Sequence, residues 1–422
     1  MRSDHHHTVC PHLHTFADVY SGRRGDRHSS LRRIRVAVPG DAMSVAALSP
    51  REKAPVRDAQ QALDVLIFAR DEADVLPGTL SSLKRQIGPL DRLTVVADHC
   101  RDSTVAMALR SDARVLVRQT GIPGKGHALR WWLEQTMPTS HPDDRIVILD
   151  ADSVAGPGFL DVMRRRIGKE MPAVQAVLET AASEIGTAGR LAALSETMDQ
   201  RVFDALRSRL GWPVRLRGTG MGFQRNVLER CARSLGTAAE DAELSILLAA
   251  SGVPIHAAWQ AKVVDAKPGD DEAAMRQRAR WVKGQMDLVR KHPRQLLALL
   301  GQGPRGWSLL SSVLGKPRSL TVPARAGAIL LLAWAGPGLG KVGDVCQVIL
   351  VLSLLVDAAA LAAAVSLSPD PGSALRALFR LPAFLLVWIR SLILAARSRD
   401  GWLRARPHPH DAGVTSPGPA SP

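Results

Sequence analysis

Five short apolar runs, each followed by a stretch of helix length, constrain the fold of this chain more than any other feature. The runs DVLIFAR, RLTVVAD, ARVLVR, RIVILDAD and AVQAVLE begin at Asp64, Arg92, Ala113, Arg145 and Ala173. They are rich in β-branched residues, as buried strands are, and strands that alternate with helices form a mostly parallel sheet. The sequence therefore predicts an α/β domain with helices on both faces of the sheet.

Acidic residues end two of these predicted strands. Asp98 follows RLTVVA, and Asp150 and Asp152 close RIVILDAD. Ligands of open α/β sheets bind outside the carboxyl ends of the strands, so we expect these carboxylates at a binding site. Residues i and i+2 of an extended chain point to the same side, which lets Asp150 and Asp152 hold one Mg²⁺ or Mn²⁺ ion that bridges to a diphosphate. The alternative is a pair of exposed carboxylates that cap the next helix.

Two glycine-containing segments follow strands or precede helices. Gly124-Lys125-Gly126 opens the helical pattern HALRWWLEQ, so backbone amides and Lys125 can meet negative charge at a helix start. The segment GTGMGF resembles a dinucleotide fingerprint but comes too late in the domain for one. We expect its glycines, Gly220 among them, to let the backbone pass close to a substrate.

Two later segments place polar residues on helices. Asp241 precedes the apolar-periodic AELSILLAAS and is either a helix cap or a catalytic base. In QRARW, Gln277, Arg280 and Trp281 stand at i, i+3 and i+4 and share one helix face. This face can bind a diphosphate and a sugar ring; the alternative is an ordinary basic helix face.

The composition changes beyond Leu320. Residues 326–368 are predicted to form a helical membrane hairpin, because 345–365 is long enough to cross about 30 Å of hydrocarbon despite Asp357. Two crossings keep both basic flanks in the cytosol, as the positive-inside tendency favours. A hairpin packed within a soluble domain is the alternative.

A basic segment follows the hairpin. In residues 372–404, Arg376, Arg380, Arg390 and Arg397 fall within about one quadrant of a helix, so we predict a basic amphipathic helix in the membrane interface. A surface helix rich in Arg is the alternative.

The remaining boundaries come from composition. Residues 1–60 are rich in His and Arg and are predicted to be disordered, 61–300 form the catalytic domain, 301–325 a linker, and 405–422 a disordered tail. The net charge of +15 favours polyanionic partners, but an aromatic content of 4% argues against the stacking platforms of single-strand nucleic-acid binders. The four cysteines lie far apart, so neither a disulfide framework nor a zinc site is indicated.

Taken in order, these motifs resemble those of the membrane-associated family 2 inverting glycosyltransferases of GT-A type (Rossmann-like) fold, which include cellulose, chitin and hyaluronan synthases. The resemblance covers Asp64 to His292 through VLIFARDEADVLPGTLSSL, VVADHCRDST, GKGHAL, DADS, GTGMGF, AED and QRARW. It implies transfer of a sugar from a nucleotide diphosphate, preferably UDP, with Mg²⁺ or Mn²⁺ at Asp150 and Asp152.

The resemblance also implies roles for single residues. Asp98 would cradle the nucleotide base, Lys125 would lie near the nucleotide pocket, and Asp241 would be the general base. The residues Gln277, Arg280 and Trp281 would frame the diphosphate and the acceptor.

Two departures from the family pattern shape the functional expectation. Ala239 stands where the family usually has Thr, and the chain offers about two membrane crossings where polymer-exporting synthases have many. We therefore expect a lipid, lipid-linked or polysaccharide acceptor, the last with a partner subunit, and a catalytic domain on the cytoplasmic face of a membrane. The competing classes are a nucleotidyltransferase acting on a sugar phosphate and a non-catalytic binder of anionic membranes or nucleic acid. The acids and QRARW favour the glycosyltransferase, with no nucleic-acid partner.

Overall fold

The structure of the protein is a computed structural model. It describes residues 63–136, 141–180, 187–265, 271–315 and 318–381, together with 385, 388–391 and 393–394. The predicted disordered segments 1–60 and 405–422 lie outside the described residues.

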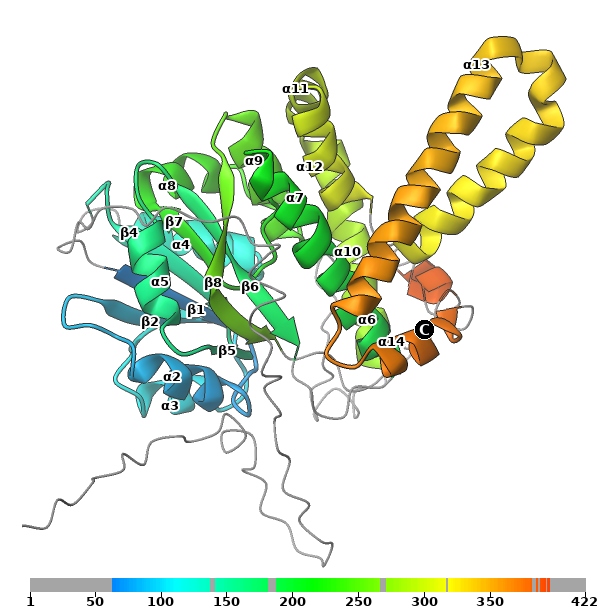
Figure 1. Cartoon of the computed structure of the whole chain (residues 1–422). Helices are drawn as coiled ribbons and strands as arrows, with labels where there is room; N and C mark the ends of the chain where they lie inside the picture. The colour runs from blue at the N-terminus through cyan, green and yellow to red at the C-terminus, as the bar shows by residue number, and fades with distance from the viewer. Residues whose placement is uncertain are drawn as a thin grey trace, which may run out of the picture.

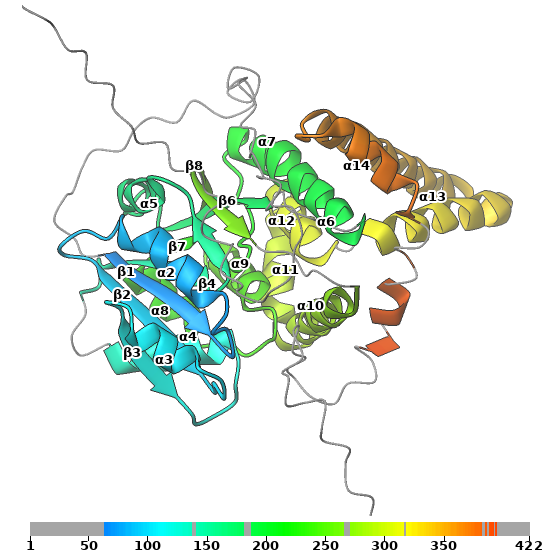
Figure 2. The same ribbon diagram turned by 90° about the horizontal axis from the view of Figure 1, so that it is seen from below.

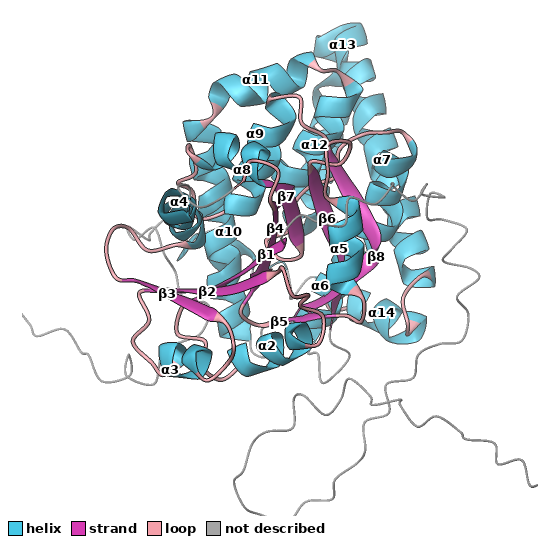
Figure 3. Cartoon of the chain, turned by 90° about the vertical axis from the view of Figure 1, so that its left-hand side faces the viewer, coloured by secondary structure: helices cyan, strands magenta, loops and turns pink. Residues whose placement is uncertain are grey.

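An eight-stranded sheet forms the centre of the N-terminal domain (Figure 1). Its strands stand in the order β3-β2-β1-β4-β7-β6-β8-β5, and β7 and β5 alone run against the common direction. Helices surround the sheet (Figure 3), so the predicted α/β class is confirmed. The strands are β1 (Leu63–Ala69), β2 (Arg92–Asp98), β3 (Arg114–Arg118), β4 (Arg145–Asp150), β5 (Ser153–Ala155), β6 (Ala173–Thr180), β7 (Met221–Gln224) and β8 (Ile255–Asp265).

The five predicted strands are confirmed as β1, β2, β3, β4 and β6, whereas β5, β7 and β8 were not predicted. Strands β5 and β7 have three and four residues, too few for a visible period. Strand β8, IHAAWQAKVVD, is rich in alanine and interrupted by polar residues, so it lacks the β-branched run that marks the others.

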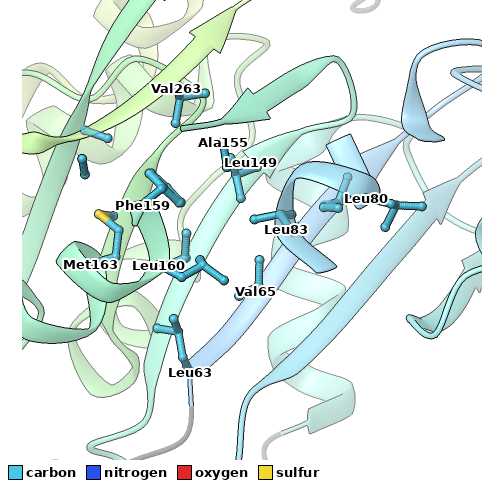
Figure 4. Close-up of a cluster of buried hydrophobic side chains, with 14 of the residues drawn as sticks. Leu63, Val65, Leu80, Leu83, Leu149, Ala155, Phe159, Leu160, Met163 and Val263 are labelled. Atoms are coloured by element: carbon cyan, nitrogen blue, oxygen red, sulfur yellow. The ribbon is translucent and has the colours of Figure 1, made fainter. Parts of the chain in front are cut away.

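Alternate residues of the central strands pack into different cores. Val65 and Ile67 of β1 lie in one core and Leu66 and Phe68 in the other, because successive side chains of a strand point to opposite faces. The first core, shown in Figure 4, includes residues of α2 (Leu76–Lys84) and α5 (Phe159–Arg166). The second includes residues of α4 (Lys125–Thr136), α8 (Arg225–Ala232) and α9 (Glu240–Ala250).

Helix α3 (Thr104–Leu109) packs beside α2, β2 and β3. Other helices lie between the sheet and the C-terminal part: α6 (Thr187–Thr197), the π-helix η3 (Met198–Asp204), α7 (Ala205–Arg209), α10 (Asp271–Lys291), α11 (Pro293–Gly301) and α12 (Pro304–Leu314). Helix α12 lies in the segment 301–325 that was predicted to be a linker. Its Leu309, Leu310 and Val313 are buried against α9 and α11, since its apolar residues recur at helical spacing after a proline that can begin a helix.

A helical hairpin, α13 (Arg318–Ser366), projects away from the sheet domain (Figures 1 and 2). Its chain reverses at Gly340, whose φ of 54° and ψ of −150° interrupt the helix. Among the described residues, the arm Gly340–Ser366 is the one helix long and apolar enough to cross a membrane, judged by length and composition alone. The other arm contains the shorter apolar stretch Leu320–Trp334.

Asp357, the acid that interrupts the apolar arm, lies in an ion-pair cluster between the two arms. Its carboxylate binds the Arg325 guanidinium and lies 3.6 Å from Nε of Arg318. Arg325 also donates to Ser353 Oγ over 3.0 Å. Opposite charges therefore join the two arms near the root of the hairpin.

The segment 372–404, predicted to be one helix, is divided. Helix α14 (Pro371–Leu378) is followed by a turn at Phe379 and Arg380. Ala374 and Ala377 of α14 are buried, and Ala374 packs in a cluster with residues of α6, η3 and α13. An interfacial position for this segment stays a prediction.

The buried Glu243 of α9 forms polar contacts with the residues at the end of α10. Its carboxylate accepts hydrogen bonds from the N–H groups of Gly236 and Thr237 and from Lys291 Nζ, and it lies 2.7 Å from Nε2 of His292. Burial disfavours the charge of Glu243, but these partners outweigh it and lower its pKa.

Glu243→Gln is expected to lower the free energy of unfolding by about 3 kcal/mol at pH 7, because it leaves the partners of a buried charge uncompensated. A lowered pKa in the fold means that the stabilisation is present above the ordinary pKa of about 4.3 and is lost as the pH falls through the folded value. Denaturant unfolding should therefore show a smaller difference between wild type and variant at low pH than at pH 7. Asp112→Asn, which removes the exposed pair with Lys84, is the control. An equal difference at both pH values would contradict the role given to Glu243.

Candidate active site

Four of the polar residues predicted from sequence gather at one edge of the sheet: Asp98, Lys125, Asp150 and Asp241. Strands β2 and β4 end there, at Asp98 and Asp150. Strand β7 runs the opposite way, so the loop that leads into it, residues 217–220, reaches the same edge. The starts of α4 and α9 meet beside this edge, since a β-carbon on Gly126 would lie 3.3 Å from that of Glu240.

Lys125 connects three of these segments. Its Nζ donates to Asp150 Oδ1 over 2.5 Å and to the carbonyl of Gly218 over 2.6 Å, and it lies 3.5 Å from Oε1 of Glu240. One ammonium group thus holds the end of β4, the loop before β7 and the start of α9 together. The predicted position of Lys125 at a helix start is confirmed.

The charges around Lys125 are predominantly negative. Burial disfavours the ammonium, but the carboxylates of Asp150 and Glu240 outweigh it, and the pKa of Lys125 is raised. Burial also raises the pKa of Glu240 to about 7; Lys125 opposes this rise, and Asp241 and Asp150 add to it. Three acidic side chains thus share one ammonium.

Gly218 lies between the predicted metal ligand and the predicted base. A β-carbon at this position would lie 3.6 Å from Asp150 Oδ2 and 4.0 Å from Asp241 Oδ2. The φ of Gly218 is 86°, which glycine adopts without strain. Both carboxylates therefore lie beside Gly218, a residue with no side chain to separate them.

The loop at 217–220 is held by buried hydrogen bonds. Gln175 of β6 accepts from the N–H of Arg217 and donates to the carbonyl of Thr219, each over 2.9 Å. Thr219 Oγ1 accepts from the N–H of Asp150 over 3.1 Å. Sequence reasoning missed Gln175 and Thr219, whereas Gly218 is one of the GTGMGF glycines that were expected to lie close to a substrate.

Gly220, predicted to lie close to a substrate, has a packing role in the structure. A β-carbon there would lie 2.9 Å from Cβ of Ala176 and 3.2 Å from Cγ2 of Val263. Its φ is 64°. The close approach of β6 and β8 thus requires glycine here, and a contact with substrate stays a prediction.

Asp98 is buried and fully engaged at the end of β2. Its Oδ1 binds the Arg118 guanidinium and lies 2.9 Å from Nδ1 of His99, and its Oδ2 accepts from the N–H of Gly124 over 2.8 Å. Asp98 thereby holds the turn that precedes Lys125. The contact with a nucleotide base predicted for it stays a prediction.

Backbone strain is concentrated at this edge of the sheet. Among the described non-glycine residues, Asp71 and His99 have positive φ, each 55°. They follow β1 and β2, and Asp71 Oδ1 accepts from the N–H of Arg101 over 2.6 Å. Strained residues of this kind occur preferentially at binding sites. Sequence reasoning did not single out either residue for this strain.

The geometry around Asp152 differs from the extended chain assumed above. Strand β4 ends at Asp150, and Ala151 and Asp152 form a turn before β5. The described residues contain no group of three or more His, Cys, Asp or Glu side chains arranged around a metal position. Asp150 with Asp152 would supply two oxygen ligands, which suits Mg²⁺ or Mn²⁺ because such ions complete their shell with water and phosphate.

The QRARW residues lie on α10 as predicted. Gln277 and Arg280 are partly buried, and the Trp281 side chain is 44% exposed. Arg278, which the sequence gave no role, is buried with its guanidinium over the Trp388 ring, 5.4 Å from the centroid.

Helix α10 packs directly on the start of α9. A β-carbon on Gly284 would lie 2.6 Å from Cβ of Ala239 and 2.8 Å from its backbone nitrogen. Glycine at 284 therefore allows the helix that carries QRARW to approach the residue that precedes Glu240 and Asp241.

Sequence and structure comparisons define the class of this protein. The family described as "Glycosyltransferase like family 2" matches residues 60–284, more than half of the chain. The chain therefore belongs to this family and is a glycosyltransferase. The nucleotidyltransferase and non-catalytic binder alternatives are set aside. No curated protein matches the chain significantly.

Solved structures support the GT-A type fold. A mannosyltransferase from Pyrobaculum calidifontis, in complex with GDP-Man and Mn²⁺, is similar over 85% of this chain and 94% of its own, with a TM-score of 0.53 and 18% identity. Glucosyl-3-phosphoglycerate synthase from Mycobacterium tuberculosis, in complex with Mn²⁺, UDP and phosphoglyceric acid, matches 47% of this chain and 68% of its own, with a TM-score of 0.34 and 23% identity. At these identities, the first similarity shows the shared fold.

Gly218→Ala is expected to reduce transfer activity by about tenfold or more, because a methyl group would occupy the space between Asp150 and Asp241 and displace a ligand. Gly211→Ala is the matched control, since Gly211 also has a positive φ, 66°, with nothing within 4 Å of a β-carbon. Both variants should lose about 1–2 kcal/mol of stability from backbone strain. Thermal unfolding and initial rates measure the two effects, and equal activity in the two variants would contradict the position given to Gly218.

Proposed function

We propose that this glycosyltransferase moves a sugar, with inversion, from a nucleotide-diphosphate donor to a lipid, lipid-linked or polysaccharide acceptor at the cytoplasmic face of a membrane. The observation that carries the proposal is the position of Asp150 and Asp241, both within 4.0 Å of a β-carbon built on Gly218, with Lys125 bonded to Asp150. In the proposed role Asp150 would bind the cation and Asp241 would be the base, so the two would act on the same bound donor and acceptor.

The donor would bind along the carboxyl edge of the sheet. Asp150 and Asp152 would hold Mg²⁺ or Mn²⁺, and the two solved neighbours were obtained with Mn²⁺. When bound, the cation neutralises charge that develops on the leaving diphosphate. Lys125 would add a positive charge beside it, and Asp98 would shape the pocket for the base. A UDP-sugar is favoured by the family resemblance, while the neighbours bind GDP-Man or UDP.

Asp241 would act as the general base. Its carboxylate takes the proton of the acceptor hydroxyl while that oxygen forms a bond to the anomeric carbon. The bond from the anomeric carbon to the diphosphate oxygen breaks in the same step, and its electron pair leaves with the diphosphate. Attack from the side opposite the leaving group inverts the anomeric configuration.

The acceptor would lie beside α10. Trp281 offers an exposed ring for a sugar face, and Arg280 and Gln277 offer donors for the diphosphate. The packing of Gly284 on Ala239 supports this proposal because it brings α10 to the start of the helix that carries Asp241. Gly220 would contribute by fixing the backbone that leads from Gly218 into β7.

The hairpin supports a membrane location. The arm Gly340–Ser366 is only 11% buried over its apolar window. Exposed apolar side chains cover both arms, and they include Leu330, Leu331, Trp334, Val342, Val345, Val348, Ile349, Leu352, Leu355 and Val356. Apolar surface of this extent would be unfavourable in water, and a bilayer would cover it. A lipid or lipid-linked acceptor would then reach the site from the same membrane.

Membranes that contain the protein are expected to release nucleoside diphosphate from one donor of a UDP- and GDP-sugar panel, with Mn²⁺ or Mg²⁺ and a lipid extract as acceptor. Asp241→Asn should abolish release while donor binding is largely kept, because the base is lost and the cation ligands remain. Asp152→Ala should lose metal-dependent donor binding itself. Asp161→Asn, which alters a 61% exposed carboxylate on α5, is the control. Full activity of Asp241→Asn would refute the assignment of Asp241 as the base.

Inversion is tested separately, by NMR of the anomeric proton of the product.

Leu352→Arg is expected to weaken membrane insertion, because an arginine near the centre of a span costs about 2.5–3.5 kcal/mol. Alkaline extraction and flotation of membranes measure the retained fraction. Leu109→Arg makes the same change at an exposed leucine of α3 in the sheet domain and should have no effect. Equal retention of both variants would contradict a membrane-spanning hairpin.

A further inference from the structure

A cluster of buried charges surrounds η3, outside the site described above. Asp199 and Asp204 belong to this π-helix, and Glu196 precedes it in α6. π-Helical turns are uncommon and occur preferentially at functional sites. The acids Glu196, Asp199 and Asp204 form ion pairs with arginines from two distant parts of the chain, the loop before β7 and the start of the hairpin.

Arg217 joins η3 to the active-site loop. Its guanidinium binds Asp204 and lies 2.7 Å from Glu196 Oε1, and its side chain is 2% exposed. Burial opposes the charge, but Glu196, Asp204 and Asp199 outweigh it, so the pKa of Arg217 is raised above its ordinary value. Arg217 is followed directly by Gly218, whose carbonyl accepts from Lys125.

Arg318 joins η3 to the hairpin. It is the first residue of α13, and its Nη1 lies 2.6 Å from Asp199 Oδ1. Its guanidinium also stands 5.1 Å from the centroid of the Phe203 ring, another residue of η3. The same arginine approaches Asp357 on the second arm, so the root of the hairpin is fixed to η3.

The π-helix is itself anchored to the sheet. Gln200 accepts from the N–H of Leu178 over 2.8 Å and donates to the carbonyl of the same residue over 2.9 Å. Leu178 belongs to β6, the strand that also carries Gln175, which binds the backbone of Arg217 and Thr219. A shift of η3 would therefore act on the active-site loop through Arg217, and a shift of β6 would act on it through Gln175.

We propose that η3 links the hairpin to the donor site. In this proposal Arg217 is a positioning residue: it holds Gly218 in place, and Gly218 in turn holds Lys125 and Asp150 in the geometry that binds the donor diphosphate. The inference rests on the proposed function, because donor binding at Asp150 is its readout. It goes beyond that function in one respect: the contact between the hairpin and η3, made by Arg318 and Asp199, determines the affinity of the site for the donor.

Two pairs of variants separate this link from general stability. Arg217→Lys keeps the charge but loses the planar fork that reaches two acids, and Arg215→Lys makes the same change two residues earlier, where the arginine lies 3.9 Å from Glu196. Arg318→Gln removes the contact of the hairpin with Asp199. Its control is Arg325→Gln. Arg325 lies on the same arm as Arg318 but pairs with Asp357 of the other arm.

The measurement is calorimetric binding of UDP and of GDP, each with MnCl₂, to the full chain in detergent, beside thermal unfolding without ligand. We expect Arg217→Lys to weaken binding about tenfold and Arg318→Gln about threefold, within the range seen for residues that modulate coupling. Arg215→Lys and Arg325→Gln should bind like wild type. Where Arg217→Lys fails to fold, Arg318→Gln and its control decide the question.

Asp150→Asn distinguishes the possible failures. Suppose that wild type binds a nucleotide and that Asp150→Asn loses this binding. If the Arg217 and Arg318 variants then bind like wild type, the link through η3 is refuted and the proposed function stands. If Arg325→Gln weakens binding as much as Arg318→Gln, the specific path through Asp199 is refuted. If wild type binds neither nucleotide, the proposed function fails first, and this inference fails with it.

Discussion

The ion pair between Lys125 and Asp150 is the interaction on which the site depends. Its ammonium also binds the carbonyl of Gly218 and approaches Glu240, so the pair joins a strand end, a loop and two helix starts that come from separate parts of the chain. A buried ion pair is costly unless further hydrogen bonds satisfy its atoms, and here the backbone supplies them. The arrangement places more acidic groups than basic ones around this edge of the sheet, as the proposed binding of a second cation requires.

The sheet determines where these groups meet. Parallel strands β1, β2 and β4 bring their carboxyl ends to one edge, and the reversed strand β7 adds the loop that precedes it. The two cores on opposite faces hold the strands rigid, so the polar residues at the edge have fixed positions. The π-helix η3 contacts both the loop before β7, through Arg217, and the start of the hairpin, through Arg318.

Much of this organisation could be predicted from the sequence. Long β-branched runs are strong local signals, which is why five strands and the helices that follow Gly124 and Ala239 were predicted. The position of Asp150 followed from the strand before it. Long-range facts had no local signal: Gly218 faces Asp150 and Asp241 only because β7 pairs with β4, and Asp98 is engaged by Arg118 only because β3 lies beside β2. Helix α12 was missed because its apolar pattern was read as part of a linker.

The reversed strand β7 also has a consequence for folding during synthesis. Strands β1 to β4 come from residues 63–150 and can pair as soon as that part of the chain is made. The free edge of β4 must then wait for β7, since Arg145 pairs with Gln224. An unpaired edge strand is a place where chains associate wrongly, and such pairing across a long loop is slow. The growing chain therefore passes through a stage in which Asp150, the predicted metal ligand, is made but the edge of the sheet is open, and chaperones or the ribosome surface would have most to protect at that stage.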